Sequence, residues 1–220
     1  MTHIKKLVFS QFKTFALLSV SIAFSLVLLM IKIRITHSFI YLFLVWNLFL
    51  AVIPFIISTY LISTPKLNKL MVLLWCLVWL LFLPNAPYIV TDLLHLNNGD
   101  SKLLWLDVLV ISSFAFNGLI LFYYSLIDIK EILSHRFNIK FPKSLTLCIL
   151  FLSSFGVYLG RFLRYNSWEI IQKPINLFKD IIQIIFHPNQ NAEAWLFTLL
   201  FGTFLTVGYY CFSNNRAFME

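Results

Sequence analysis

The chain of 220 residues is 60% hydrophobic and 18% aromatic, and only 12% of its residues are charged. Soluble domains contain roughly 45–50% apolar and 25% charged residues, so this composition excludes an ordinary soluble protein and indicates a membrane protein. The net charge of +8 comes from basic residues in short segments between apolar runs, rather than on one continuous face. This distribution argues against a nucleic-acid partner.

Six apolar runs match the roughly 20 residues that a helix needs to cross a bilayer. They cover roughly residues 14–31, 39–62, 70–90, 103–127, 145–163 and 194–212. The first run follows lysines, as a secretory signal does, but it reaches Ile31 without a small-residue cleavage site, so we expect an uncleaved first span. The sequence predicts an all-α polytopic membrane helix bundle of about six transmembrane helices, in a single integral membrane domain over residues 1–220.

The third run contains a Pro-Asn-Ala-Pro segment at residues 84–87. The apolar residues before it, 70–83, are too few to span the bilayer, so we place the segment within or near the hydrocarbon. A proline has no N–H group and disfavours the helical region for the residue before it, so Leu83 and Ala86 are expected to leave the helix. The amide of Asn85 is suited to hydrogen-bond the backbone there. The sequence therefore predicts a broken third helix.

A short helix over residues 87–96 is predicted after the break, because proline is favoured in the first turn of a helix. Polar side chains fall at positions i, i+3, i+4 and i+7 on one face of it: Tyr88, Thr91, Asp92 and His95. Asp92 can orient His95 as a base, or both can ligate a cation. One His and one Asp are too few for zinc, so no metal site is assigned. The alternatives are a purely structural role in capping and packing, and conduction of protons or ions.

Asp107 stands at the start of the fourth run, two residues after Trp105. An ionisable residue inside a span is costly and usually faces a cavity or a partner, which makes Asp107 a third catalytic candidate. At the interface it is instead an ordinary carboxylate near the positive end of a helix dipole. With Glu169 it is also a candidate to complete a metal shell.

A second polar segment ends the fifth run. A Gly-x-x-x-Gly pattern at residues 156–160 favours close helix packing, and Arg161 and Arg164 follow with forked donors that suit phosphate or carboxylate oxygens. Alternatively, both arginines reach lipid headgroups or pair with acidic residues. Two spans separate this segment from the first polar segment, so we expect both on one side of the membrane. The substrate-binding candidates are Asn85, Tyr88, Thr91, Arg161, Arg164, Asn166, Trp168 and Glu169.

Residues 174–187 are apolar but too short to span a bilayer comfortably. Their polar side chains share one face, which predicts an interfacial amphipathic helix. A lid packed on the bundle is the alternative, and a re-entrant loop is a third interpretation.

The basic residues between the runs predict the orientation. With the N-terminus inside, the inner segments carry ten Lys and Arg residues and the outer segments carry seven, with Lys32 and Arg34 counted in an outer loop. Cytoplasmic segments carry the excess, so we expect both termini to be cytoplasmic and the polar site to face outward from the cell membrane. The three cysteines lie in separate apolar runs and indicate neither disulfides nor a zinc site.

Three segments together resemble a known family. They are Phe-Leu-Pro-Asn-Ala-Pro-Tyr-Ile-Val-Thr-Asp-Leu-Leu-His at residues 82–95, Trp-x-Asp at 105–107, and Gly-Val-Tyr-Leu-Gly-Arg-Phe-Leu-Arg-Tyr-Asn-Ser-Trp at 156–168. The chain resembles the bacterial integral-membrane family domain of unknown function 1361 through most of its length. The resemblance implies a bacterial multi-spanning membrane protein and supplies no reaction, cofactor or catalytic residue.

The sequence is consistent with three functions. The first is a membrane protein whose outward polar site acts on a lipid or envelope precursor with an anionic headgroup, with acid–base or metal chemistry at Asp92 and His95 and phosphate binding at Arg161 and Arg164. The second is a small transporter, indicated by the broken helix, which is expected to be a homo-oligomer because six spans are few. The third is a non-catalytic membrane assembly partner. Membrane lipids are the expected partners, and the sequence assigns no cofactor.

Overall fold

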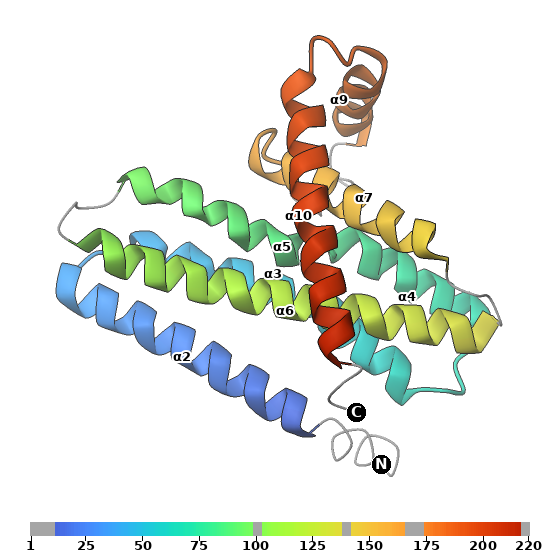
Figure 1. Ribbon diagram of the computed structural model, residues 1–220, viewed down its shortest axis with the longest axis horizontal. Coiled ribbons are helices and arrows are strands. Elements are labelled where there is room, and N and C mark those ends of the chain that lie inside the picture. The colour runs from blue at the N-terminus through green and yellow to red at the C-terminus, as the bar shows by residue number, and fades with distance from the viewer. Residues whose placement is uncertain (1–11, 99–102, 138–141, 166–173, 217–220) are drawn as a thin grey trace. The chain divides into compact units, whose positions relative to one another are not determined.

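The computed structural model describes residues 12–98, 103–137, 142–165 and 174–216, and within these ranges every regular element is a helix (Figure 1). In chain order they are α2 (Phe12–Thr36), η1 (Ile40–Leu42), α3 (Phe43–Ser63), α4 (Lys69–Phe82), α5 (Asn85–Tyr88), η2 (Ile89–Asn98), α6 (Leu104–Phe137), α7 (Lys143–Arg161), α9 (Pro174–Phe186) and α10 (Ala192–Arg216). The helix η1 and the helix η2 are 3₁₀ helices.

Six helical segments of the described chain are long and apolar enough to cross a membrane. They cover 14–36, 40–63, 69–96, 104–137, 143–161 and 192–214. The predicted all-α bundle of about six transmembrane helices is therefore confirmed. The fourth helix differs most from its predicted extent, because α6 continues ten residues beyond the expected end at Ile127. At 34 residues and about 1.5 Å of rise per residue it is roughly 50 Å long, which exceeds the hydrocarbon thickness.

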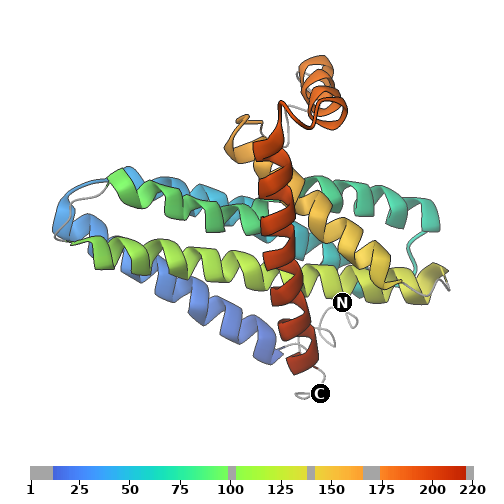
Figure 2. The same cartoon turned by 45° about the horizontal axis from the view of Figure 1, so that its top comes forward.

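The chain divides into two compact units, residues 1–137 and 138–220. The expectation of one domain over the whole chain stays a prediction. In the first unit, α6 lies against α3 and also contacts α2, α5 and η2 (Figure 2). Its core consists of fully buried apolar side chains, among them Leu44, Leu61, Val110, Phe114 and Phe122. The helix η2 packs against α6 and also contacts α3.

The third span is interrupted in its hydrogen bonds rather than in its backbone conformation. Leu83 has φ −54° and ψ −42°, and Ala86 lies inside α5, so the expectation that both leave the helical region is wrong. Proline disfavours the helical region for the preceding residue through steric contact, but this is only a bias. Hydrogen bonds over three residues offset it in this segment. The Ala86 N–H donates to the carbonyl of Leu83 at 3.2 Å, and the Asn85 amide donates to the carbonyl of Phe82 at 2.9 Å. Asn85 therefore satisfies backbone, as expected.

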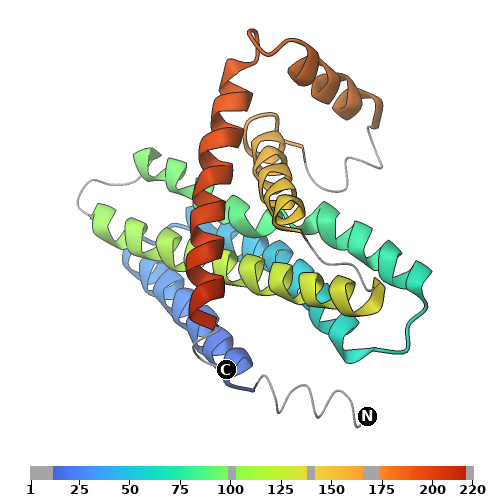
Figure 3. The ribbon, with the colours of Figure 1, turned by 45° about the vertical axis from the view of Figure 1, so that its right-hand side comes forward.

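The second unit pairs α7 with α10 (Figure 3). Gly202 in α10 lies against the ring of Phe151, and a Cβ atom at this position would approach the ring to 2.5 Å. Ser154 in α7 donates a hydrogen bond of 3.0 Å to the carbonyl of Thr198. Small and polar residues thus bring the two helices together, as in other membrane helix pairs.

The helix α9 has the amphipathic character predicted for residues 174–187. Leu177 and Ile184 are buried within the second unit, and the Tyr165 hydroxyl donates to the Asp180 carboxylate at 2.7 Å. Another apolar strip stays exposed: Ile175, Phe178, Ile182, Ile185 and Phe186. One side of α9 therefore packs against the second unit, as in the lid interpretation. The other side is apolar and exposed, and such a face can insert into the membrane surface, as in an interfacial helix. Its position at the membrane surface stays a prediction.

Candidate functional site

Asp92 is fully buried in the first unit. The side-chain amide of Asn47, in α3, donates a hydrogen bond of 2.8 Å to Oδ2 of Asp92. A carboxylate in a membrane-spanning segment needs polar partners, because burial without them costs several kcal/mol. The second span supplies such a partner, which the sequence pattern did not identify.

His95 follows Asp92 by three residues and is half-buried. Its imidazole packs against the ring of Phe43 in α3, with 5.0 Å between ring centroids. Side chains at i and i+3 of a 3₁₀ helix eclipse one another, so Asp92 and His95 lie in line along η2. Asn47 and Phe43 are four residues apart on one face of α3. Two contacts, one buried and one nearer the surface, therefore hold the carboxylate and the imidazole in register.

The 3₁₀ geometry corrects the expected arrangement of the polar face. Tyr88 is the last residue of α5, and within η2 Thr91 lies one residue before Asp92, about 120° around the helix from the line of Asp92 and His95. The Thr91 hydroxyl donates to the carbonyl of Tyr88 at 2.6 Å, which is a local backbone contact. The prediction of one shared face was wrong because it assumed 3.6 residues per turn.

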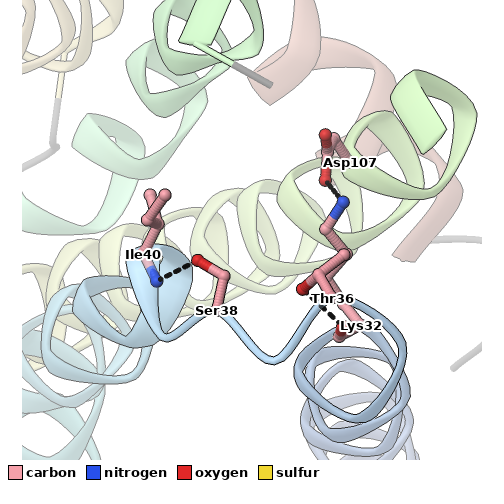
Figure 4. Close-up of polar contacts among 5 residues, drawn as sticks. All are labelled: Lys32, Thr36, Ser38, Ile40 and Asp107. Carbon is pink, nitrogen blue, oxygen red and sulfur yellow. Dashed lines mark hydrogen bonds and ion pairs between the residues drawn. The ribbon is translucent and has the colours of Figure 1, made fainter. Parts of the chain in front are cut away.

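Asp107 is fully buried and forms an ion pair with Lys32, whose Nζ lies 2.5 Å from Oδ1 (Figure 4). Neither carboxylate oxygen makes a hydrogen bond of good geometry within the described residues. The Lys32 ammonium also lies 5.9 Å from the centroid of the Tyr41 ring, within the range of cation–π attraction. Removing both charges from water is expensive, and their mutual attraction repays it only partly. The ion pair is therefore costly to maintain.

The end of α2 brings Tyr41 back towards this pair. The Thr36 hydroxyl donates to the carbonyl of Lys32 at 2.8 Å, and the His37 N–H donates to the carbonyl of Ile33 at 2.8 Å. His37 has φ 51°, a left-handed conformation that commonly ends helices. The chain then re-enters the bundle through η1, so that Tyr41 is buried beside Lys32.

The ion pair also changes the interpretation of Lys32. The charge count treated it as an outer-loop residue, but it lies inside α2 and is only 5% exposed. A buried lysine with a carboxylate partner is not a free loop charge, so it drops out of the count that predicts orientation. Arg34, two residues later, is exposed. Lys130 and Arg136, counted on the other side, also lie inside a helix, so the predicted orientation stays a prediction.

The predicted arginines belong to the second unit. Arg161 is the last residue of α7 and is half-buried, whereas Arg164 is exposed and has φ 61°. The Tyr165 N–H donates to the carbonyl of Leu159 at 3.0 Å, which closes the end of the helix. Three further binding candidates lie outside the described residues: Asn166, Trp168 and Glu169. The predicted phosphate site at Arg161 and Arg164 stays a prediction.

Sequence reasoning missed several polar residues of the spans that the helices bring together, all of them buried except the half-buried Asn47: Lys32, Asn47, Ser58, Asn117 and Asp128. Each interrupts an apolar run, and that interruption was the available signal. Within the described part of the chain, no group of three or more His, Cys, Asp or Glu residues is placed to hold a metal ion.

The sequence model of one family, described as a protein of unknown function (DUF1361), matches residues 46–207 of the chain. Neither the curated proteins nor the solved structures contain a match. The matched region includes Asp92, His95 and Asp107, whereas Lys32 precedes it. Because the match covers well over half of the chain, this six-span membrane protein belongs to the DUF1361 family.

Proposed function

We propose that the outer end of the first unit is an acid–base site for the anionic headgroup of a membrane lipid or envelope precursor. His95 is the group that exchanges protons with the ligand, and Asp92 orients it. The observation that carries this proposal is the arrangement on η2, where a buried carboxylate held by Asn47 at 2.8 Å is followed, one 3₁₀ turn later, by a half-exposed imidazole. Enzymes use such a buried carboxylate to orient a histidine base.

Exposed tryptophans support a position near the headgroups. Trp46 is the neighbour of Asn47 and is 54% exposed, and Trp105 precedes Asp107 by two residues and is 62% exposed. Tryptophan is enriched where hydrocarbon meets headgroups, so these side chains indicate the depth of the membrane boundary. A half-exposed imidazole at this depth can meet a headgroup without entering the hydrocarbon.

Asp107 takes a different role in this proposal from the one first expected. It is fully buried and paired with Lys32, so it is closed to a lipid. Its contribution is to hold the end of α2 against the start of α6. A cation for the anionic headgroup is available at Arg34, which is exposed at the end of α2.

The test compares lipid and envelope-precursor profiles of a strain that lacks the protein with strains that carry His95→Ala, Asp92→Asn or the control Leu94→Ala. Leu94 is 59% exposed and lies beside His95 in the same helix. We expect His95→Ala to reproduce the profile of the deletion strain at normal abundance in the membrane fraction, and Leu94→Ala to match wild type. A wild-type profile for His95→Ala would refute the proposal, as would loss of the variant protein from the membrane, which indicates a structural role.

A small transporter is the second candidate, favoured by the interrupted hydrogen bonds of the third span. The carbonyl of Ala86 is in close contact with Gly118 of α6, so the interruption lies where two spans cross. Discontinuous helices often line substrate sites in transporters. An enzyme predicts lipid turnover in detergent, a transporter predicts uptake only in sealed vesicles, and an assembly partner predicts neither.

A further inference from the structure

Buried polar residues follow α6 from one end of its membrane span to the other. Asp107 and Asn117 are fully buried, and Asp128 is 1% exposed. The rise of an α-helix is about 1.5 Å per residue, so the two carboxylates are roughly 31 Å apart, which matches the hydrocarbon thickness of about 30 Å. Asn117 lies about midway between them.

Each of these three residues meets a polar group from another helix. Asp107 meets Lys32 of α2, as described, and Asp128 accepts a hydrogen bond of 3.1 Å from the hydroxyl of Ser58 in α3. Burying such groups in a span is costly, and it usually marks a pathway or a partner. Asp107, Asn117 and Asp128 therefore form three polar contacts at different depths along α6, and one local packing contact does not explain all three.

Asn117 forms the middle one of these three polar contacts. Its Nδ2 lies 2.9 Å from Oγ of Ser25, 2.9 Å from the carbonyl of Ser113 and 3.3 Å from the carbonyl of Ser21. Its Oδ1 is buried and has no hydrogen-bond partner within the described residues. An unpaired polar atom in a span is a position that can bind water or a ligand, because leaving it buried and unpaired is unfavourable.

Hydroxyl groups fill part of the interval between Asn117 and Asp128. Ser125 is fully buried one turn before Asp128, and it accepts a long hydrogen bond of 3.4 Å from the indole of Trp79. Hydroxyls both donate and accept, so they can pass a proton along a hydrogen-bonded chain.

We propose that these groups form a proton path through the first unit. A proton binds a carboxylate at one end, moves through hydroxyl groups, the Asn117 site and water in the intervals, and leaves from the carboxylate at the other end. No electron is transferred, and the pH gradient or the membrane potential supplies the driving force. The competing explanation is that the same contacts only hold α2 and α3 against α6, because interhelical hydrogen bonds also stabilise membrane bundles.

The test uses the purified full chain in sealed liposomes that contain a pH-sensitive dye, with a potassium diffusion potential imposed by valinomycin. We expect wild type to acidify or alkalinise the lumen faster than empty liposomes do. Asp128→Asn, which keeps the size of the side chain, is expected to reduce the flux to that of empty liposomes. Thr203→Val is the matched control, because Thr203 carries an exposed hydroxyl on α10, and it is expected to conduct like wild type.

Equal proton flux in wild-type and empty liposomes overturns the proposal. This comparison uses no variant, so it tests the proposal even if Asp128→Asn does not incorporate into liposomes. Wild-type flux in properly incorporated Asp128→Asn also overturns it and leaves the packing explanation. The lipid activity proposed for His95 is tested by the lipid profiles of variant strains and by turnover in detergent, neither of which needs sealed liposomes. The two proposals therefore fail or stand separately.

Discussion

Replacing Lys32 with methionine tests whether its ion pair with Asp107 determines the stability of the first unit. Methionine keeps most of the length of the side chain and removes the ammonium that lies 2.5 Å from the carboxylate. The carboxylate is fully buried, and the other polar group beside it is the Tyr41 hydroxyl, which carries no charge. We expect Lys32→Met to be strongly destabilising.

The size of the destabilisation follows from the buried Asp107 carboxylate that loses its cationic partner. Breaking a buried pair by removing one partner costs about 3–5 kcal/mol. For a chain of this size, 1 kcal/mol corresponds to a change in Tm of about 2–4 °C, so Lys32→Met should lower Tm by about 6–20 °C. The measurement is thermal unfolding of the purified protein in detergent, together with its abundance in the membrane fraction. Arg34→Met is the control, because Arg34 is exposed on the same helix, and its Tm should change little.

The double variant Lys32→Met with Asp107→Leu separates the pair from its individual charges. Replacing a buried ion pair by apolar residues of similar size is often neutral or stabilising. The double variant should therefore recover most of the Tm that Lys32→Met loses, which is a strong coupling in a double-mutant cycle. A double variant as unstable as Lys32→Met, or a single variant as stable as Arg34→Met, would show that the pair is not the main contact between α2 and α6.

Two further predictions concern the packing of the first unit. Gly118→Ala should destabilise by about 1–3 kcal/mol, because its Cβ would collide with the backbone carbonyl of Ala86, whereas truncation of the exposed Phe116 to alanine should cost much less in the same detergent assay. Arg136→Met should expose the segment after α3 to proteolysis, because the guanidinium holds the carbonyl of Thr64 at 2.6 Å, and each hydrogen bond to a charged group contributes about 1.5–3 kcal/mol. An unchanged proteolysis rate would refute the second prediction.

The number and type of spans could be predicted because they depend on local properties. Hydrophobic length alone placed all six segments, and the amphipathic pattern placed α9 within a residue or two. The end of the fourth helix was predicted too early, since Asp128 and Lys130 look like the start of a loop. Asp128 is instead buried against Ser58 within a longer helix, so a partner 70 residues away decided its environment.

The contacts of the candidate site could not be predicted for the same reason. Asn47 and Asp92 are 45 residues apart in sequence, and no periodicity within one span indicates which residue of another span it meets. The candidates Asp92, His95 and Asp107 were recognised as chemically unusual because each is an ionisable group near or inside an apolar run. Their partners depend on how α2, α3 and α6 pack, which becomes visible only in three dimensions.

The Pro-Asn-Ala-Pro segment at residues 84–87 acquires its significance from what it does to the helix after it. The prolines cannot donate hydrogen bonds, and the chain continues as η2, a 3₁₀ helix, instead of unwinding. A 3₁₀ helix rises about 2.0 Å per residue and completes a turn in three residues, so it both lengthens the span and aligns Asp92 with His95. An uninterrupted α-helix would rotate the two side chains about 60° apart, and Asn47 and Phe43 could not hold both in the same way. The 3₁₀ geometry of η2, which begins directly after this segment, therefore aligns the candidate site.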